Sequence, residues 1–113
     1  MLLVICGGAA LAQAPKYPVK AVRMLVGFAP GGATDIIARL LAPSLTESLG
    51  QTVVVENRPG ASSQIAGQLV ARSAPDGYTL LMTTQTLMTS QMIEGKNFPD
   101  LTKDFAAVSL AAT

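Results

Sequence analysis

Two apolar runs, each followed by small residues and then by an amphipathic segment, dominate the pattern of the chain. Residues 22–28 (VRMLVGF) are almost continuously apolar, which is typical of a strand covered on both faces. The small residues 29–33 lead from this strand into a segment with helical spacing. The positions predicted to face the core of that helix are Ile37, Leu41 and Leu45, with Leu40 and Leu49 close by.

The limits of this first helix are also predicted from single residues. Thr34 is a good N-cap residue, and Asp35 places a negative charge in the first turn, where the helix dipole favours it. Pro43 lies inside the pattern and removes a hydrogen bond, so we expect a kink or a restart near Ala42. Gly50 is expected to end the helix.

A second strand and helix follow with similar spacing. Residues 52–56 (TVVVE) predict a strand, and 57–61 (NRPGA) predict a turn. We expect Ser62 or Ser63 to cap a second helix that ends near Ser73. The residues predicted to face inward from that helix are Ile65, Leu69 and Val70.

The last third of the chain predicts one more strand, a short helix and the start of another strand. Residues 78–83 form the third strand, and a short helix after the polar stretch extends to about Ile93. Residues 95–103 are expected to be an exposed loop, and 105–110 an apolar strand.

This alternation predicts an α/β fold with a parallel βαβαβ sheet and right-handed crossovers. Ligands of such sheets bind outside the carboxyl ends of the strands. Three stretches are expected there, namely 28–35, 57–63 and 83–85. The first is also the start of a helix, which attracts anions through unpaired N–H groups and the helix dipole.

Composition narrows the possible chemistry. The chain has 113 residues, half of them hydrophobic, and a formal net charge of +1, which suits a globular domain and gives no basis for binding nucleic acid. There is no histidine, and the one cysteine is Cys6. Ser-His, Cys-His and histidine-metal sites are therefore excluded, and we expect no catalytic residues, no metal site and no cofactor.

The first residues resemble a secretory signal peptide. Residues 2–11 are apolar but too few to span a bilayer, and small residues at 10, 12 and 14 fit the cleavage rule. We expect residues 1–12 to be the signal peptide, with cleavage after Ala12 or, as the alternative, after Ala14. Removal of Cys6 would leave no thiol in the mature chain.

A nucleotide site is the alternative hypothesis for the glycine-containing turn. The glycines at 27, 31 and 32 match neither GxGxxG nor a phosphate loop ending in GK. Glu56 at the end of the second strand nevertheless resembles a ribose-binding acid, and Arg58 could meet a 2′-phosphate. A Rossmann-like dinucleotide-binding domain of an oxidoreductase therefore stays open.

Several separated motifs resemble one family in particular. The motifs FAPGG followed by Asp35, Ala38-Arg39, LGQ at 49–51, VVVENRPGA at 53–61 and PDGYTLL at 75–81 are similar to the N-terminal region of the Bug-type (TctC-like) receptors. These are the periplasmic solute-binding proteins of tripartite tricarboxylate transporters. The resemblance implies a two-lobed, clamshell (Venus-flytrap) fold of which 17–113 form part of lobe I, with the second lobe outside this chain. It also implies a periplasmic receptor, not an enzyme, that passes small carboxylates to membrane permease subunits.

The resemblance further implies which residues meet the ligand, through backbone groups, hydroxyls and ordered water. The predicted ligand-binding residues are Phe28, Ala29, Pro30, Gly31, Gly32, Thr34, Asp35, Thr83, Thr84 and Gln85. Asp35 could orient water or meet a ligand amino group, or it could serve the helix start alone. Phe28 could wall the pocket or pack in the core, and Asn57 and Arg58 are interpreted as structural.

Overall fold

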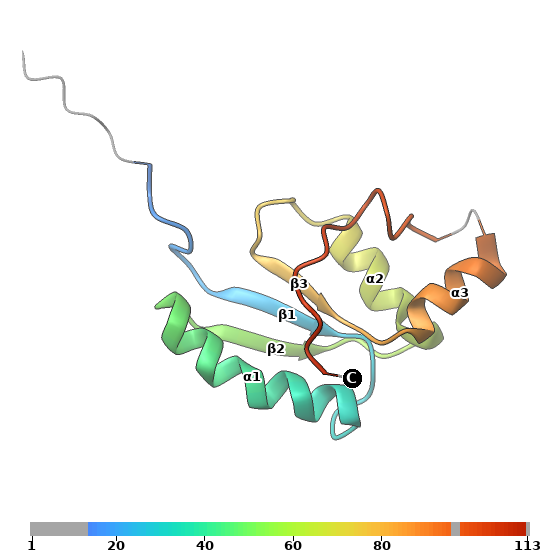
Figure 1. Cartoon of the computed structure of the whole chain (residues 1–113), viewed down its shortest axis with the longest axis horizontal. Helices are drawn as coiled ribbons and strands as arrows, with labels where there is room; N and C mark the ends of the chain where they lie inside the picture. The colour runs from blue at the N-terminus through green and yellow to red at the C-terminus, as the bar shows by residue number, and fades with distance from the viewer. Residues whose placement is uncertain (1–13, 96–97, 113) are drawn as a thin grey trace, which may run out of the picture.

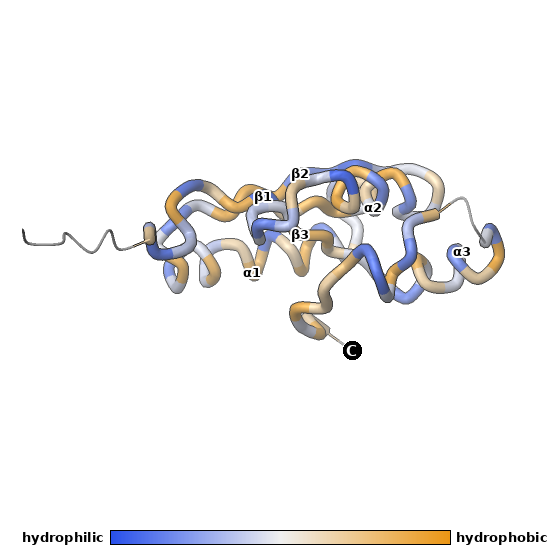
Figure 2. Tube along the Cα trace, turned by 90° about the horizontal axis from the view of Figure 1, so that it is seen from above, coloured by the Kyte–Doolittle hydropathy of each residue, from blue (hydrophilic) through white to orange (hydrophobic). Residues whose placement is uncertain are grey.

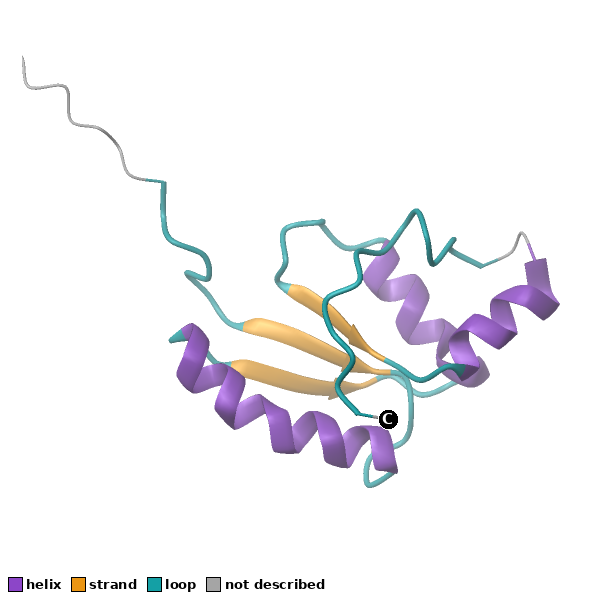
Figure 3. Cartoon of the chain, in the orientation of Figure 1, coloured by secondary structure: helices purple, strands orange, loops and turns teal. Residues whose placement is uncertain are grey.

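The computed structural model describes residues 14–95 and 98–112 and contains one three-stranded sheet with helices around it (Figures 1 and 3). All strand pairs are parallel, and the strand order is β2-β1-β3. The predicted parallel βαβαβ architecture is therefore confirmed. The elements in chain order are β1 Val22–Val26, α1 Ala33–Leu49, β2 Val53–Asn57, the 3-10 turn η1 Ala61–Ser63, α2 Gln64–Ala71, β3 Thr79–Met82 and α3 Thr86–Glu94.

The two crossovers run in opposite directions along the sheet, which places α1 and α2 on opposite faces when both are right-handed. Figure 1 shows α1 in front, beside β2, and the paler α2 behind. Val22, Met24 and Val26 of β1 alternate with Leu25, so they belong to the α1 face, where Ala38 and Ala42 pack against them. This face holds the main hydrophobic core.

Helix α2 packs closely against the opposite face of the sheet. Leu25 and Leu87 are each 1% exposed, and Ala66 of α2 is fully buried. A Cβ on Gly67 would lie 2.8 Å from Cζ of Phe98 and 3.7 Å from Cδ1 of Leu87. The absence of a side chain at position 67 therefore lets α2, α3 and the later loop meet.

Small residues, and not the large ones that periodicity selected, form the buried faces of both helices. Leu40 is 72% exposed, and Ile65 and Leu69 are each 46% exposed, so their predicted core positions are wrong. Apart from the polar Asp35 and Gln64 in the first turns, the buried positions of the two helices are Ala38, Ala42, Ala66 and Gly67. Ile37, Leu41, Leu45 and Val70 are half-buried. Small residues let each helix lie close to the sheet, and the larger side chains of the helix then lie at the edge of the interface.

The limits of α1 differ from the prediction at its start and at its proline. The helix begins at Ala33 with Gly32 as N-cap, so Thr34 is not the cap, because the chain is already helical one residue earlier. Pro43 lies within one continuous helix, so of the expected kink or restart, the restart is wrong. Ala42 and Leu45 on either side of Pro43 pack onto the sheet. Gly50 ends α1 as expected, at φ 69°, and donates its N–H to Thr46 O at 3.0 Å.

Residues 105–110 are not a strand, contrary to the prediction. A strand requires a hydrogen-bonded neighbour, and within 14–95 and 98–112 the sheet contains only β2, β1 and β3. Val108 is 81% exposed and Leu110 is 76% exposed. Figure 2 shows this end of the chain projecting away from the layers of the sheet.

The predicted signal peptide lies outside the described residues, apart from the alternative cleavage residue Ala14.

The segment before β1 is anchored at the amino ends of the strands. Tyr17 donates its hydroxyl to Gly77 O at 2.6 Å, and Val19 donates its N–H to the Tyr78 hydroxyl at 2.8 Å. Lys20 Nζ lies 4.5 Å from the centre of the Tyr78 ring, which is a cation-π contact.

Among the described residues, none of the helices combines the length and apolar character needed to cross a membrane.

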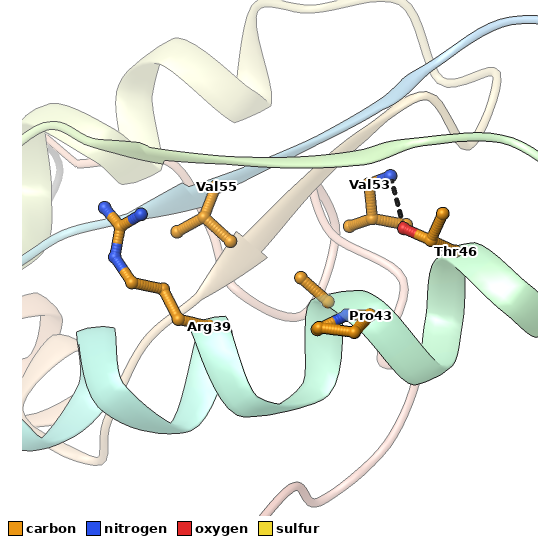
Figure 4. A pocket seen from close by; sticks show the side chains of 6 residues that line it. Arg39, Pro43, Thr46, Val53 and Val55 are labelled. Carbon is orange, nitrogen blue, oxygen red and sulfur yellow. Dashed lines mark hydrogen bonds between the residues drawn. The ribbon is translucent and has the colours of Figure 1, made fainter.

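Thr46 on α1 satisfies an outward-facing amide of the edge strand β2. The N–H of Val53 donates to Thr46 Oγ1 at 2.9 Å (Figure 4), and Val53 is 6% exposed. Thr46→Val is expected to lower the free energy of unfolding by about 1–3 kcal/mol, because a buried amide loses its acceptor. Urea unfolding would measure this change. Thr46→Ser, which keeps the hydroxyl, is the matched control, and equal losses in the two variants would contradict a role for the hydrogen bond.

Candidate functional site

Three loops meet at the carboxyl ends of the strands, where the sheet topology predicts a ligand. The loop after β1 exposes Ala29, Pro30, Gly31 and Gly32 to solvent. Gly31 has φ +83°, a conformation that favours glycine, and Gly32 donates its N–H to Ala29 O at 3.3 Å. This tight turn delivers the chain to the start of α1.

The start of α1 has no side-chain cap. Its N-cap is Gly32, and the first intrahelical bond runs from Ile36 N to Gly32 O at 3.0 Å. The amides of Ala33, Thr34 and Asp35 precede that bond and therefore have no acceptor within the helix. The positive end of the helix dipole lies at the same place, so these amides can bind an anion.

Asp35 is buried beneath the turn, and three donors hold its carboxylate. Gly31 N donates to Oδ2 at 2.9 Å, Asn57 Nδ2 donates to Oδ1 at 2.8 Å, and Arg39 Nε lies 3.0 Å from both oxygens. The Asp35 side chain is 4% exposed. Its carboxylate is therefore occupied by protein donors, which supports the role at the helix start that was one of the two alternatives.

Asn57 and Arg39 extend this cluster to the loop and to the end of β2. Asn57 Nδ2 also donates to Phe28 O at 3.1 Å, and Arg39 Nη2 donates to Asn57 Oδ1 at 2.9 Å. Phe28 itself packs against the main core. The structural interpretation of Asn57 is thus supported by its contacts.

These contacts lower the pKa of Asp35 to about 2, first through the Gly31 amide and then through Arg39 and Asn57. The unfolded chain has an ordinary carboxyl with a pKa of about 3.9. Because the folded pKa is the lower one, Asp35 stabilises the fold above about pH 4, and this contribution disappears as the pH falls towards about 2.

Acid unfolding is expected to reveal this linkage. Across the range from about pH 4 to about pH 2, the urea midpoint of the wild type should fall more steeply than that of Asp35→Asn, which has no carboxyl at this position. Asp100 also has its pKa lowered to about 2, chiefly by Thr102, and titrates in both proteins. Parallel pH profiles for the two proteins would show that Asp35 does not contribute.

The loops after β2 and β3 are joined by a hydrogen bond between two hydroxyls. Ser63 Oγ lies 3.1 Å from Thr83 Oγ1, and Ser63 is fully buried. Ser63 is the N-cap residue of α2, one of the two positions predicted, but its hydroxyl contacts Thr83 and makes no capping hydrogen bond. Ala61, Ser62 and Ser63 have φ values of 45°, 53° and 75°, three consecutive left-handed positions without glycine.

The loop after β3 supplies the remaining predicted residues. Thr83 is half-buried, whereas Thr84 and Gln85 are exposed, and the hydroxyls of Thr84 and Thr86 contact each other. The structure thus brings the three predicted stretches to one end of the sheet, with Asp35 and Phe28 directed into the protein. Their contact with a ligand stays a prediction.

Sequence reasoning named Arg39 as part of a family motif but did not assign it to this region. Its spacing of four residues from Asp35 on one helix is a signal for an ion pair that could have identified it. Arg39 also borders a hollow of about 350 Å3 between α1 and the outer edge of β2, shown in Figure 4. Across the part of the chain that the structure describes, no group of three acidic, histidine or cysteine side chains could hold a metal.

Comparison with known proteins decides what kind of protein carries these loops. The model of the tripartite tricarboxylate transporter family receptor matches residues 37–112. The chain belongs to this receptor family. BugT of Bordetella pertussis is 46% identical over 86 residues, covering 76% of this chain and 26% of BugT. A UPF0065 protein of the same species is 41% identical over 108 residues, covering 93% of this chain and 33% of that protein. The chain therefore spans about a quarter to a third of the length of these relatives.

Solved structures of receptor-family proteins show the same fold. The periplasmic binding protein BugD is 54% identical with a TM-score of 0.56, over 57% of this chain and 22% of BugD. Two Rhodopseudomonas palustris proteins, one solved with adipate and MatC with bound malate, are each 45% identical, with the same TM-score of 0.56 and the same coverages, 57% and 22%. The predicted family and the predicted fold class, part of a periplasmic binding protein, are confirmed.

Membership of the receptor family replaces the dinucleotide alternative, and the contacts of Glu56 agree with this. Arg23 Nε and Nη2 donate to the two oxygens of Glu56 at 2.8 and 2.9 Å, and Arg58 approaches at 3.4 Å. The proposed ribose-binding acid is therefore held by two arginines. The same contact accounts for Arg58 as a structural residue.

Proposed function

We propose that this chain is part of a periplasmic receptor that captures small dicarboxylates for a tripartite tricarboxylate-type transporter. The observation that carries the proposal is the start of α1, which has no side-chain cap and whose first-turn amides lie at the carboxyl end of β1. In the same family, similar proteins have been solved with adipate and with malate. Backbone amides would hold one ligand carboxylate, with the hydroxyls and amide of Thr34, Thr84 and Gln85 around it.

The rest of the proposal concerns the whole protein. A clamshell receptor would close a second lobe over the ligand and present the closed form to membrane permease subunits. The protein would bind without catalysis, and export to the periplasm would remove residues 1–12. Support for the clamshell and the transporter comes from the family and from the short share of the relatives' length that this chain covers, and support for export comes from the apolar residues 2–11.

A chemical-shift titration of the 15N-labelled chain tests the binding step. Malate and adipate are expected to shift the amide signals of Ala33, Thr34 and Asp35, and those of Thr84 and Gln85. Adipamide, which has the same carbon chain without charge, is the control and should leave these signals in place. Shifts that adipamide reproduces, or no shifts with any dicarboxylate, would contradict the proposal.

A further inference from the structure

Arg39 holds a position from which it acts on the candidate ligand loop without belonging to it. Its side chain leaves the second turn of α1, pairs with Asp35 at 3.0 Å and donates to Asn57 Oδ1 at 2.9 Å. The guanidinium thus bridges the start of α1 and the last residue of β2. About half of the side chain, 53%, is exposed.

The cluster of Asp35, Arg39 and Asn57 holds the loop after β1 near its beginning and at its turn. Asn57 holds the carbonyl of Phe28, where the loop begins, and Asp35 holds the amide of Gly31, where it turns. The Gly31 amide is consequently directed inward and is not free for a ligand. The orientation of the following amides, at the start of α1, depends on this arrangement.

The charged side chains near the candidate site also affect whether an anion can bind there. Residues 28–35 and 83–85 contain one charged side chain, Asp35, and its charge has the same sign as a carboxylate ligand. Arg58 in the neighbouring loop is directed to Glu56, at 3.4 Å. Arg39 is the cation in contact with Asp35, so it is the group placed to cancel the repulsion between Asp35 and a bound anion.

We propose that Asp35, Arg39 and Asn57 form a positioning cluster for the ligand loop, and that Arg39 makes this loop compatible with doubly charged carboxylates by neutralising Asp35. This inference rests on the proposed function in so far as the ligand is a dicarboxylate. None of the three side chains needs to touch the ligand. The cluster would set both the direction of the first-turn amides and the net charge beneath them.

Three variants separate charge from structure. Arg39→Met keeps the packing of the aliphatic stem but removes the positive charge that neutralises Asp35. We expect this variant to bind malate and adipate at least about tenfold more weakly than the wild type. The loss of affinity should become smaller as salt is added. Asp35→Asn combined with Arg39→Met removes both charges while an amide oxygen still accepts from Gly31, so affinity should return towards the wild type. Arg72→Met removes an equal charge from an exposed site at the end of α2 and serves as the control.

Chemical-shift titrations with malate and adipate at low and high salt provide the affinities, and amide hydrogen exchange of Gly31 provides a readout that needs no ligand. Equal affinities for Arg39→Met and Arg72→Met would overturn the charge role, as would a double variant no better than Arg39→Met alone. A loss that salt does not change would overturn it as well. Faster Gly31 exchange in Arg39→Met and Asp35→Ala is the result expected of a positioning cluster, and unchanged exchange would overturn that part. If the wild type binds neither acid, the proposed function fails, and the exchange measurement still decides whether the cluster positions the loop.

Discussion

Replacing Gly27 with alanine is expected to lower the free energy of unfolding by about 3 kcal/mol. A Cβ at this position would lie 1.6 Å from Ser63 Oγ, 2.4 Å from Ser63 Cβ and 2.8 Å from Ser63 Cα. The last of these is a backbone atom, so a rotation of the serine side chain cannot relieve the overlap. The loop after β1 would have to move away from the start of α2, which separates the first two loops of the candidate site.

Gly32→Ala is the control for this prediction. Its added Cβ would lie 3.4 Å from Ala29 O, a contact that a small adjustment accommodates, and its φ of −74° suits alanine. Urea unfolding followed by circular dichroism should show a large loss of stability for Gly27→Ala and little change for Gly32→Ala. Similar midpoints for the two variants would mean that Gly27, just after β1, and Ser63, at the end of η1, are not in close contact.

Leu25→Ala is expected to cost about 2–5 kcal/mol, because it removes a side chain that is 1% exposed and leaves a cavity between the sheet and α2. Leu40→Ala deletes the same atoms from a position that is 72% exposed. That control should change the free energy of unfolding by less than about 0.5 kcal/mol. Thermal or urea unfolding of the two variants measures the difference directly, and comparable losses would contradict the burial of Leu25 or the exposure of Leu40.

The contrast between Leu25 and Leu40 shows which part of the fold sequence patterns could predict. Apolar runs identified β1, β2 and β3 within one or two residues at each end, because buried strands admit few polar side chains, but the apolar run 105–110 wrongly predicted a fourth strand. Helical periodicity identified α1 and α2 but selected their larger apolar residues as the core. The buried apolar positions on the faces that meet the sheet are Ala38, Ala42, Ala66 and Gly67, and the distance between helix and sheet that favours small residues is a property of the assembled layers.

The candidate site, like the fold, could be predicted from the sequence only in part. The rule that ligands bind at the carboxyl ends of parallel strands selected three loops that do lie together at one end of the sheet, because the order of strands and helices alone determines which loops meet there. The contacts of the Asp35 carboxylate could be predicted only in part from the sequence. Arg39 is four residues away on the same helix and within reach of a local rule, whereas Asn57 is 22 residues away and meets Asp35 only once β2 lies beside β1. The link between Ser63 and Thr83 likewise depends on the placement of β3.

The anchored segment before β1 has a practical consequence for measuring binding. Tyr17 and Val19 are attached to Gly77 and Tyr78, at the amino ends of the strands, and Figure 1 shows the chain entering the sheet at the end opposite to the three loops. A protein immobilised on a biosensor surface through its amino-terminal side would therefore present the candidate site to the solution. A tether at a cysteine introduced near Gln85 would instead direct that site towards the surface.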